Sequence, residues 1–329
     1  MSGPGRSYRT GISLQDLFRL FPDDEAAEAW FIKKRWPGGV VCPHCGSTNV
    51  QEGAKHPSMP FRCREKECGK RFSTKTGTIM EGSKLGYQTW LVAAYLLSTS
   101  LKSVSSTKLA RDLNITQRSA WFLAHRLRAA LKAEGQRFYG PVEIDETYVG
   151  GRYKNRPRAV RDRMALEMGW GGSAGKEPVV GIRDRPTGHV AARAIYIADR
   201  RTLLNFLYEH VKLGSTVYSD GAAQYRRIPY DHHAVEHSEE YVRGDVHTNG
   251  LESFWSMIKR AYKGTFHKLS PKHLDRYVQE FAGRHNLREQ DTIEMMAAIA
   301  IGMRGKRLRY TELIAPNGLP NGSRPTASR

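Results

Sequence analysis

The chain has 329 residues and carries 52 Lys and Arg against 33 Asp and Glu, a formal net charge of +19. This length can bury one sizeable core plus smaller modules, and such an excess of cations favours a polyanionic partner, most simply nucleic acid. A ribosome-associated basic protein fits the same composition. The longest apolar run, Trp90 to Leu97, is far shorter than the ~20 residues of a membrane span, so we expect no membrane partner. The N-terminus lacks a secretory apolar core, which predicts a reducing, cytoplasmic location.

Residues 1–36 are predicted to form N-terminal helices. The first helix covers Leu14–Leu20. The second begins at Asp23 or Asp24 and ends near Trp36, because acidic residues open it and basic residues close it.

Residues 37–82 are predicted to form a zinc ribbon, because they hold all four cysteines of the chain in the motifs CPHC and CREKEC. Two cysteine pairs in a reducing compartment indicate a tetrahedral structural Zn²⁺ site. A glycine follows the second cysteine of each pair, as the turns of zinc ribbons require. The alternative, a set of unrelated buried thiols, is disfavoured by the spacing. The predicted ligands are Cys42, Cys45, Cys63 and Cys68.

Residues 83–135 are predicted to be a helical DNA-binding region. An apolar helix covers about Gln88–Leu97, and two further helices, Ser105–Leu113 and Thr116–Lys132, flank a turn at Asn114. This pattern is typical of a helix-turn-helix, and residues 101–140 carry a net charge of +6. The alternative is a plain helix pair with a solvated basic face. The predicted DNA contacts in this region are Gln117, Arg118, Ser119 and Arg126.

Residues 136–303 are predicted to form an α/β catalytic domain. The expected elements, in order, are a strand at Pro141–Gly151, a basic loop at Arg152–Arg163, a hairpin turning at Pro186–Gly188, a helix at Arg200–Val211, a strand at Ser215–Asp220, a short helix around Ala222–Tyr225, a strand at His232–His237, an amphipathic helix within His247–His267 and a helical segment at Pro271–Met303. Residues 304–329 are basic and rich in Pro, Gly and Ser, which predicts a flexible tail.

Three carboxylates occupy informative places in this order. Asp145 lies in the first strand, Asp220 ends a later strand, and Glu252 lies in the first turn of the amphipathic helix. This order suggests a ribonuclease-H-like core that gathers all three. Hard oxygen ligands suit Mg²⁺, and two such ions stabilise the attacking and leaving oxygens of a phosphoryl displacement. Each residue also has an ordinary interpretation, as a strand-end, turn or first-turn residue.

The amphipathic helix carries a cation in register with its carboxylate. Lys259 follows Glu252 by seven residues, so both lie on roughly the same helix face, two turns apart. A carboxylate and a cation on one rim suit a metal ion and a phosphate, whereas a solvated surface lysine is the alternative. We expect the adjacent Arg260 to contact DNA as well.

The motifs DETYVGG, VYSDGAAQY and HTNGLESFWSMIKRAYKGTFH, preceded by the zinc ribbon and helix-turn-helix, resemble the DDE transposases of bacterial insertion sequences related to eukaryotic Merlin elements, the ISXO-two-like group. The resemblance covers about residues 14–300. It implies that Asp145, Asp220 and Glu252 bind two catalytic Mg²⁺ ions, with Mn²⁺ as a substitute, and that Lys259 contacts DNA. Some members carry asparagine at the third position, so Asn249 stays the alternative to Glu252.

The resemblance implies a DNA transposase that binds terminal inverted repeats, cleaves the transposon ends and joins the freed 3′-hydroxyl to target DNA. Because two ends must meet, a homodimer or larger synaptic assembly on double-stranded DNA is expected, in the bacterial nucleoid. Two alternatives are a catalytically silent DNA-binding regulator and a ribonuclease-H-like nuclease without strand transfer. A ribosomal or structural zinc-ribbon protein leaves the ordered carboxylates unexplained.

Overall fold

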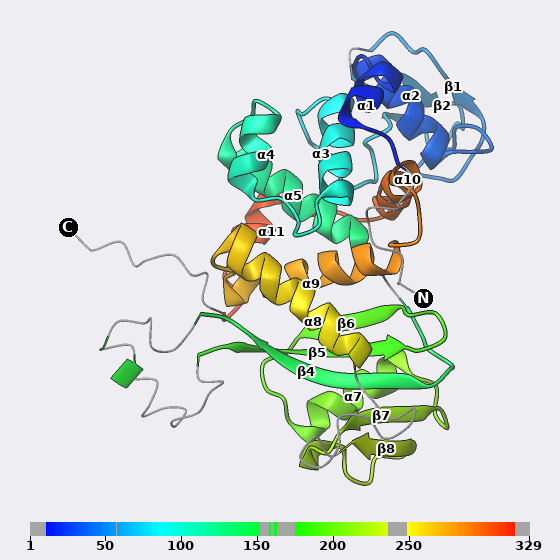
Figure 1. The fold of residues 1–329 in the computed structure, drawn as a ribbon. Helices are drawn as coiled ribbons and strands as arrows, with labels where there is room; N and C mark the ends of the chain where they lie inside the picture. The colour runs from blue at the N-terminus through cyan, green and yellow to red at the C-terminus, as the bar shows by residue number, and fades with distance from the viewer. Residues whose placement is uncertain are drawn as a thin grey trace. The chain divides into compact units, whose positions relative to one another are not determined.

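The computed structural model describes residues 11–319 except 57, 134, 152–157, 159–160, 163–174 and 236–248. The chain forms two compact units (Figure 1). The first comprises Met1–Lys132 and Leu287–Ala315, and the second comprises Ala133–Asn286 and Pro316–Arg329. The larger segment of the second unit, Ala133–Asn286, is therefore inserted between the two segments of the first. Within the described residues, no helix has the length and apolar character needed to cross a membrane.

The first unit is mainly helical. Its helices are α1 (Leu14–Leu20), α2 (Asp24–Arg35), α3 (Tyr87–Thr99), α4 (Ser106–Asp112), α5 (Gln117–Leu131), α10 (Thr292–Gly302) and α11 (Tyr310–Ile314). Helix α3 is buried on nearly all sides, as its apolar sequence requires, and packs against α2, α5 and α10. Two predicted starts are confirmed, because Asp23 caps α2 and Thr116 caps α5 through backbone N–H groups. The turn predicted at Asn114 is also present, with φ of 50°.

The cysteine-rich segment of the first unit forms a small antiparallel sheet of β1 (Val50–Gln51), β2 (Phe61–Cys63) and β3 (Arg71–Phe72). Its small core contains Val40, Cys42, Phe61, Cys63 and Phe72, and the partly buried ring of Trp36 packs edge-on against the two phenylalanine rings. Gly46 and Gly69 have φ of 78° and 56°, which confirms the tight turns predicted after each cysteine pair.

The helical segment predicted at 271–303 consists of two helices. Helix α9 (Pro271–Asn286) belongs to the second unit, whereas α10 belongs to the first. Asp291 ends the break by capping α10, and the Glu294 side chain accepts the backbone N–H of Asp291 in return. This capping box, D-x-x-E, is a sequence signal for a helix start that periodicity alone does not reveal.

Residues 304–315 also differ from the predicted flexible tail, because they fold onto the first unit. Leu308 and Leu313 are buried in the core that α3 and α5 share. The Lys306 ammonium donates to the backbone oxygens of Ala129 and Lys132 at 3.0 and 2.7 Å, where α5 ends and its carbonyls lack helical partners. The residues that anchor this segment, Lys306, Leu308 and Leu313, follow neither a helical nor a strand period. Their spacing in the sequence therefore does not predict an ordered segment.

The second unit contains a five-stranded sheet of β4 (Val142–Val149), β5 (Glu177–Asp184), β6 (Val190–Ala194), β7 (Thr216–Asp220) and β8 (Asp231–Val235). The strand order is β6-β5-β4-β7-β8. Strands β5 and β6 form the predicted hairpin, β4 pairs antiparallel with β5, and β7 runs parallel to both β4 and β8. The predicted fifth strand at 232–237 is β8, whose last two predicted residues lie outside the described residues.

Helices cover both faces of this sheet (Figure 1). Helix α7 (Arg200–His210) packs on the face that buries Val142 and Ile144 of β4, while α8 (Asn249–Ala261) and α9 pack on the face of Val149. Because strand side chains alternate, Glu143 and Asp145 point to the α8 face. Helix α8 passes into a π-helical turn at Tyr262–Phe266, and the predicted preceding residues His247 and Thr248 lie outside the described residues.

The buried stripe of α8 agrees with the sequence prediction. Leu251, Phe254, Trp255 and Ile258 are all at most 3% exposed. Glu252, Lys259 and Arg260 lie on the exposed side of the same helix. The helix thus anchors itself in the α8–α9 core and presents its charged residues outward.

Candidate active site and zinc site

The four cysteines of the first unit come together in space. The Sγ atoms of Cys42 and Cys68 are 3.8 Å apart, those of Cys45 and Cys63 are 3.6 Å apart, and all four lie within 4.8 Å of one another. A tetrahedron with Zn–S bonds of about 2.3 Å has edges of about 3.8 Å. The donor set and its spacing therefore fit a structural Zn²⁺ with no vacant position for catalysis.

The predicted catalytic carboxylates come from three elements of the second unit. Strand β4 carries Asp145, β7 ends at Asp220, and the first turn of α8 carries Glu252. The parallel ladder of β4 and β7 pairs Val142 with Val217, and each aspartate follows its paired valine by three residues. The two aspartates therefore occupy equivalent positions on neighbouring strands, two residues beyond the last paired residues, Glu143 and Tyr218.

These carboxylates act on one another electrostatically. The pKa of Asp145 is raised to about 6, mainly by burial and in smaller part by the negative charges of Asp220 and Glu252, against the hydrogen bond from the Trp255 indole, which favours the charged form. Burial likewise raises the pKa of the adjacent Glu146 to about 7, with contributions from Asp220 and Asp145. Partly buried like charges of this kind suit a divalent cation, which would offset their repulsion.

The carboxylates are not packed into a preformed cage. Throughout the parts of the chain that the structure describes, the cysteine group is the one set of three or more potential ligands with donor atoms this closely gathered. Without a bound cation, the repulsion between the negative charges keeps the carboxylates apart. Of the two predicted third ligands, Glu252 acts electrostatically on Asp145, whereas Asn249, one turn earlier in α8, is a neutral amide.

Tyr225 lies on the face of the sheet opposite to Asp145. Its hydroxyl is buried and interacts electrostatically with Glu146, yet makes no hydrogen bond of normal geometry to any described residue. Glu146 therefore points to the α7 face, where Tyr225 belongs to the core, whereas Asp145 points to α8. The two neighbouring acids are thus separated by the sheet itself.

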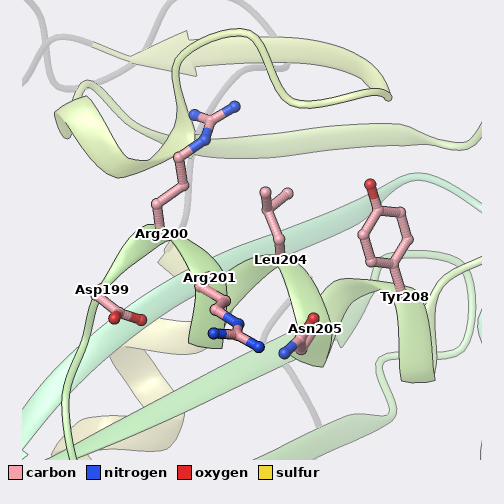
Figure 2. A pocket seen from close by; sticks show the side chains of 6 residues that line it. All are labelled: Asp199, Arg200, Arg201, Leu204, Asn205 and Tyr208. Carbon is pink, nitrogen blue, oxygen red and sulfur yellow. The ribbon is translucent and has the colours of Figure 1, made fainter.

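Arg200 holds the loop that follows Asp220. Its guanidinium donates to the backbone oxygens of Gln224, Arg226 and Arg227, around the short helix η3 (Ala223–Tyr225). Figure 2 shows Arg200 with the other side chains that line a pocket on α7. That pocket, about 490 Å³, is lined by Asp199, Arg200, Arg201, Leu204, Asn205 and Tyr208. None of the predicted catalytic carboxylates lines it, so we assign the pocket no part in the chemistry.

The predicted DNA contacts separate into exposed and buried residues. Gln117 and Arg118 are exposed at the start of α5, while Ser119 is half-buried and its hydroxyl accepts from Thr116. Arg126 is only 7% exposed, and its guanidinium donates to the backbone oxygens of Leu308 and Glu81. The prediction that Arg126 contacts DNA is therefore wrong. On a helix, nine residues separate it from Gln117, which turns it toward the core.

Glu143 is the site residue that sequence reasoning missed. It is fully buried, accepts from Arg183 at 3.1 Å and Arg185 at 3.2 Å, and its second oxygen accepts the backbone N–H of Leu251 at 3.2 Å. This carboxylate therefore ties the beginning of α8, and with it Glu252, to the sheet. The signal was the acidic residue at a core position of an alternating strand, where burial requires a partner.

Replacing Glu143 with alanine is expected to destabilise the protein by about 3–5 kcal/mol, because it leaves Arg183 and Arg185 near the core without their partner. Urea unfolding of the full chain measures the loss. The matched control is Glu209→Ala, which removes an exposed ion pair with Arg193 and is expected to cost at most about 1 kcal/mol. Equal small losses in both variants would show that Glu143 does not anchor α8.

Comparison with known families agrees with the zinc site and the α/β unit. Residues 22–71 match the transposase zinc-ribbon domain, and residues 137–286 match the ISXO2-like transposase domain. The chain therefore belongs to the ISXO2-like transposase family of insertion sequences, as the motifs predicted. An uncharacterized protein in transposable element ISH50 of Halobacterium salinarum is 30% identical over 283 residues, which cover 82% of this chain and 93% of that protein. Membership of this family implies that the chain binds DNA.

Proposed function

We propose that this protein cleaves the ends of an insertion sequence and joins the freed 3′-hydroxyl to target DNA by Mg²⁺-dependent phosphoryl transfer. The observation that carries the proposal is the electrostatic coupling of Asp145 to Asp220 and Glu252, carboxylates from two neighbouring strands and the covering helix. Groups this far apart in the sequence become neighbours only through the fold, and perturbed carboxylates of this kind concentrate at functional sites.

The sheet supports a ribonuclease-H-like core for the second unit. Its central strand β4 is antiparallel to the hairpin on one side and parallel to β7 on the other. Helices cover both faces, and the carboxylates lie at β4, at the end of β7 and on α8. This is the arrangement that the order of elements in the sequence suggests.

Asp145, Asp220 and Glu252 would hold the catalytic Mg²⁺ ions. Bound metal supplies charge neutralisation for the attacking and leaving oxygens of the displacement. The protein's own contribution is to position the carboxylates from rigid elements, with Glu143 fixing the start of α8 and Arg200 fixing the loop after Asp220. Lys259 and Arg260, exposed in the last turn of α8, would hold the DNA backbone beside the ions.

The first unit would recognise the terminal inverted repeats. Helices α4 and α5 form a capped pair joined by a four-residue turn, the arrangement expected of a helix-turn-helix. Gln117 and Arg118 are exposed at the start of α5, where a recognition helix meets base edges, although Arg118 also stacks on Tyr310 at 4.4 Å. The zinc ribbon would add backbone contacts. Because two ends must be cut together, the working form would be a dimer or larger assembly.

The proposal is tested by incubating the purified full chain with its own gene-flanking DNA and Mg²⁺ and mapping nicks at single-nucleotide resolution. We expect nicks at an inverted-repeat boundary and joined products with target DNA. Glu252→Gln should remove both, whereas Glu209→Gln, the same change on α7 of the opposite sheet face, should remove neither.

Each other result has a definite meaning. Binding without nicks would favour a catalytically silent regulator, and nicks without joining would favour a nuclease. Nicks that persist in Glu252→Gln would move the third ligand to Asn249 or elsewhere.

A further inference from the structure

Trp255 contacts the first catalytic carboxylate directly. Its indole Nε1–H donates to Oδ2 of Asp145 at 2.9 Å, from a side chain that is only 3% exposed. Trp255 follows Glu252 by three residues on α8, so one helical turn carries both a proposed metal ligand and a hydrogen-bond donor to another. This hydrogen bond joins helix α8 directly to strand β4 within the proposed site.

The neighbouring strand is shaped to receive the indole. Gly181 of β5 pairs directly with Asp145 of β4. A Cβ atom at Gly181 would lie 2.6 Å from Cη2 and 2.7 Å from Cζ2 of Trp255, which is too close for any side chain. Glycine in a strand interior weakens the strand, and its presence there commonly marks a close approach by another group. The indole therefore lies against bare backbone opposite the carboxylate that it binds.

We propose that Trp255 is a positioning residue that orients Asp145 for metal binding, with Gly181 providing the space that the indole needs. The inference rests on the proposed function, since it assigns a role toward the ion that Asp145 would hold. A hydrogen bond to one carboxylate oxygen fixes the rotation of the group and leaves the opposite oxygen for the metal.

A packing role alone makes a different prediction. Trp255 belongs to the core cluster of α8 and α9, so any truncation lowers stability whatever its effect on metal. Trp255→Phe keeps an aromatic ring in that core and removes the N–H. Gly181→Ala keeps the indole and displaces it from the opposite strand. The two variants therefore disturb one contact from two sides, with different changes to the core.

The test is Mn²⁺ binding to the full chain without DNA, measured by isothermal titration calorimetry. We expect Trp255→Phe and Gly181→Ala each to weaken binding by roughly 10–100-fold, the usual cost of removing the partner of a metal ligand. Trp90→Phe is the matched control. It removes another buried indole N–H bond, to Ser83 Oγ at 3.2 Å in the first unit, and should leave Mn²⁺ affinity unchanged.

A double-mutant cycle on the metal-free protein supplies an independent readout. The shift in urea midpoint caused by Trp255→Phe should shrink when Asp145 is already alanine, because the removed bond no longer exists there. Equal shifts in both backgrounds, or unchanged Mn²⁺ affinity in folded Trp255→Phe and Gly181→Ala, would overturn the inference while leaving the proposed function standing. A wild-type chain that binds no Mn²⁺ would overturn the proposed function, and this inference with it.

Discussion

Asp220→Asn is expected to abolish strand cleavage while leaving the binding of DNA ends nearly intact. The substitution removes one negative charge from the proposed metal site and replaces a carboxylate oxygen by an amide nitrogen. A metal ion contributes several kcal/mol to a phosphoryl displacement, so we expect a loss of at least about 10³-fold in cleavage rate, equivalent to about 4 kcal/mol. Single-turnover cleavage and gel-shift titration on the same DNA measure the two effects separately.

The structure explains why this variant should still fold. Asp220 is half-buried at the end of β7, and its Oδ1 accepts the backbone N–H of Ala222 at 3.2 Å, a role that an amide oxygen can keep. Asp231→Asn is the matched control. Asp231 is an exposed residue that begins the neighbouring strand β8, and its carboxylate accepts a hydrogen bond from the Thr216 hydroxyl. Parallel loss of cleavage and DNA binding in Asp220→Asn would instead identify Asp220 as a structural residue.

Removal of zinc is expected to unfold the segment from Cys42 to Cys68. Structural zinc contributes roughly 10–16 kcal/mol of apparent binding energy in small zinc domains, far more than the few buried rings of this one can supply. Limited proteolysis with a strong chelator should therefore produce early cuts in this segment, and added Zn²⁺ should reverse them. The sheet of the second unit has a core separate from that of the zinc ribbon, so it should remain resistant to protease.

Cys63→Ser provides the genetic version of this experiment. Cys63 ends β2 and is buried in the ribbon core, so its loss removes both a thiolate ligand and a strand anchor. The variant should be cut in the same segment without chelator and should no longer be rescued by Zn²⁺. Protease resistance that survives both treatments would show that the four thiols do not hold a metal.

Local signals in the sequence were sufficient for most elements. The caps Asp23 and Thr116, the turn at Asn114 and the apolar stripe of α8 depend on residues within a few positions of one another. Cysteine spacing likewise led to the zinc ribbon. The predicted roles of Asp145, Asp220 and Glu252 rest on their order among the elements, and they stay predictions until the substitutions above are made.

What the sequence could not supply are contacts between distant segments. The burial of Arg126 depends on Leu308, 182 positions away, so its charge alone suggested a surface role. The bond from Trp255 to Asp145 spans 110 positions, and helical periodicity marked Trp255 only as a core residue. The order of strands in the sheet also depends on contacts between distant segments. Side-chain alternation determines which face of the sheet a residue occupies, but it does not determine which strands are neighbours.

The division of the first unit into two sequence segments has a consequence for synthesis. Met296, Ile299 and Met303 belong to the same core as Trp90 and Leu127, yet they are translated after Ala133–Asn286, the larger segment of the second unit. The N-terminal helices therefore cannot complete their core until the last tenth of the chain has left the ribosome, and domains otherwise tend to fold in the order of synthesis. A frameshift or stop codon near residue 290 would consequently disable the N-terminal unit, although every residue before Lys132 would be intact.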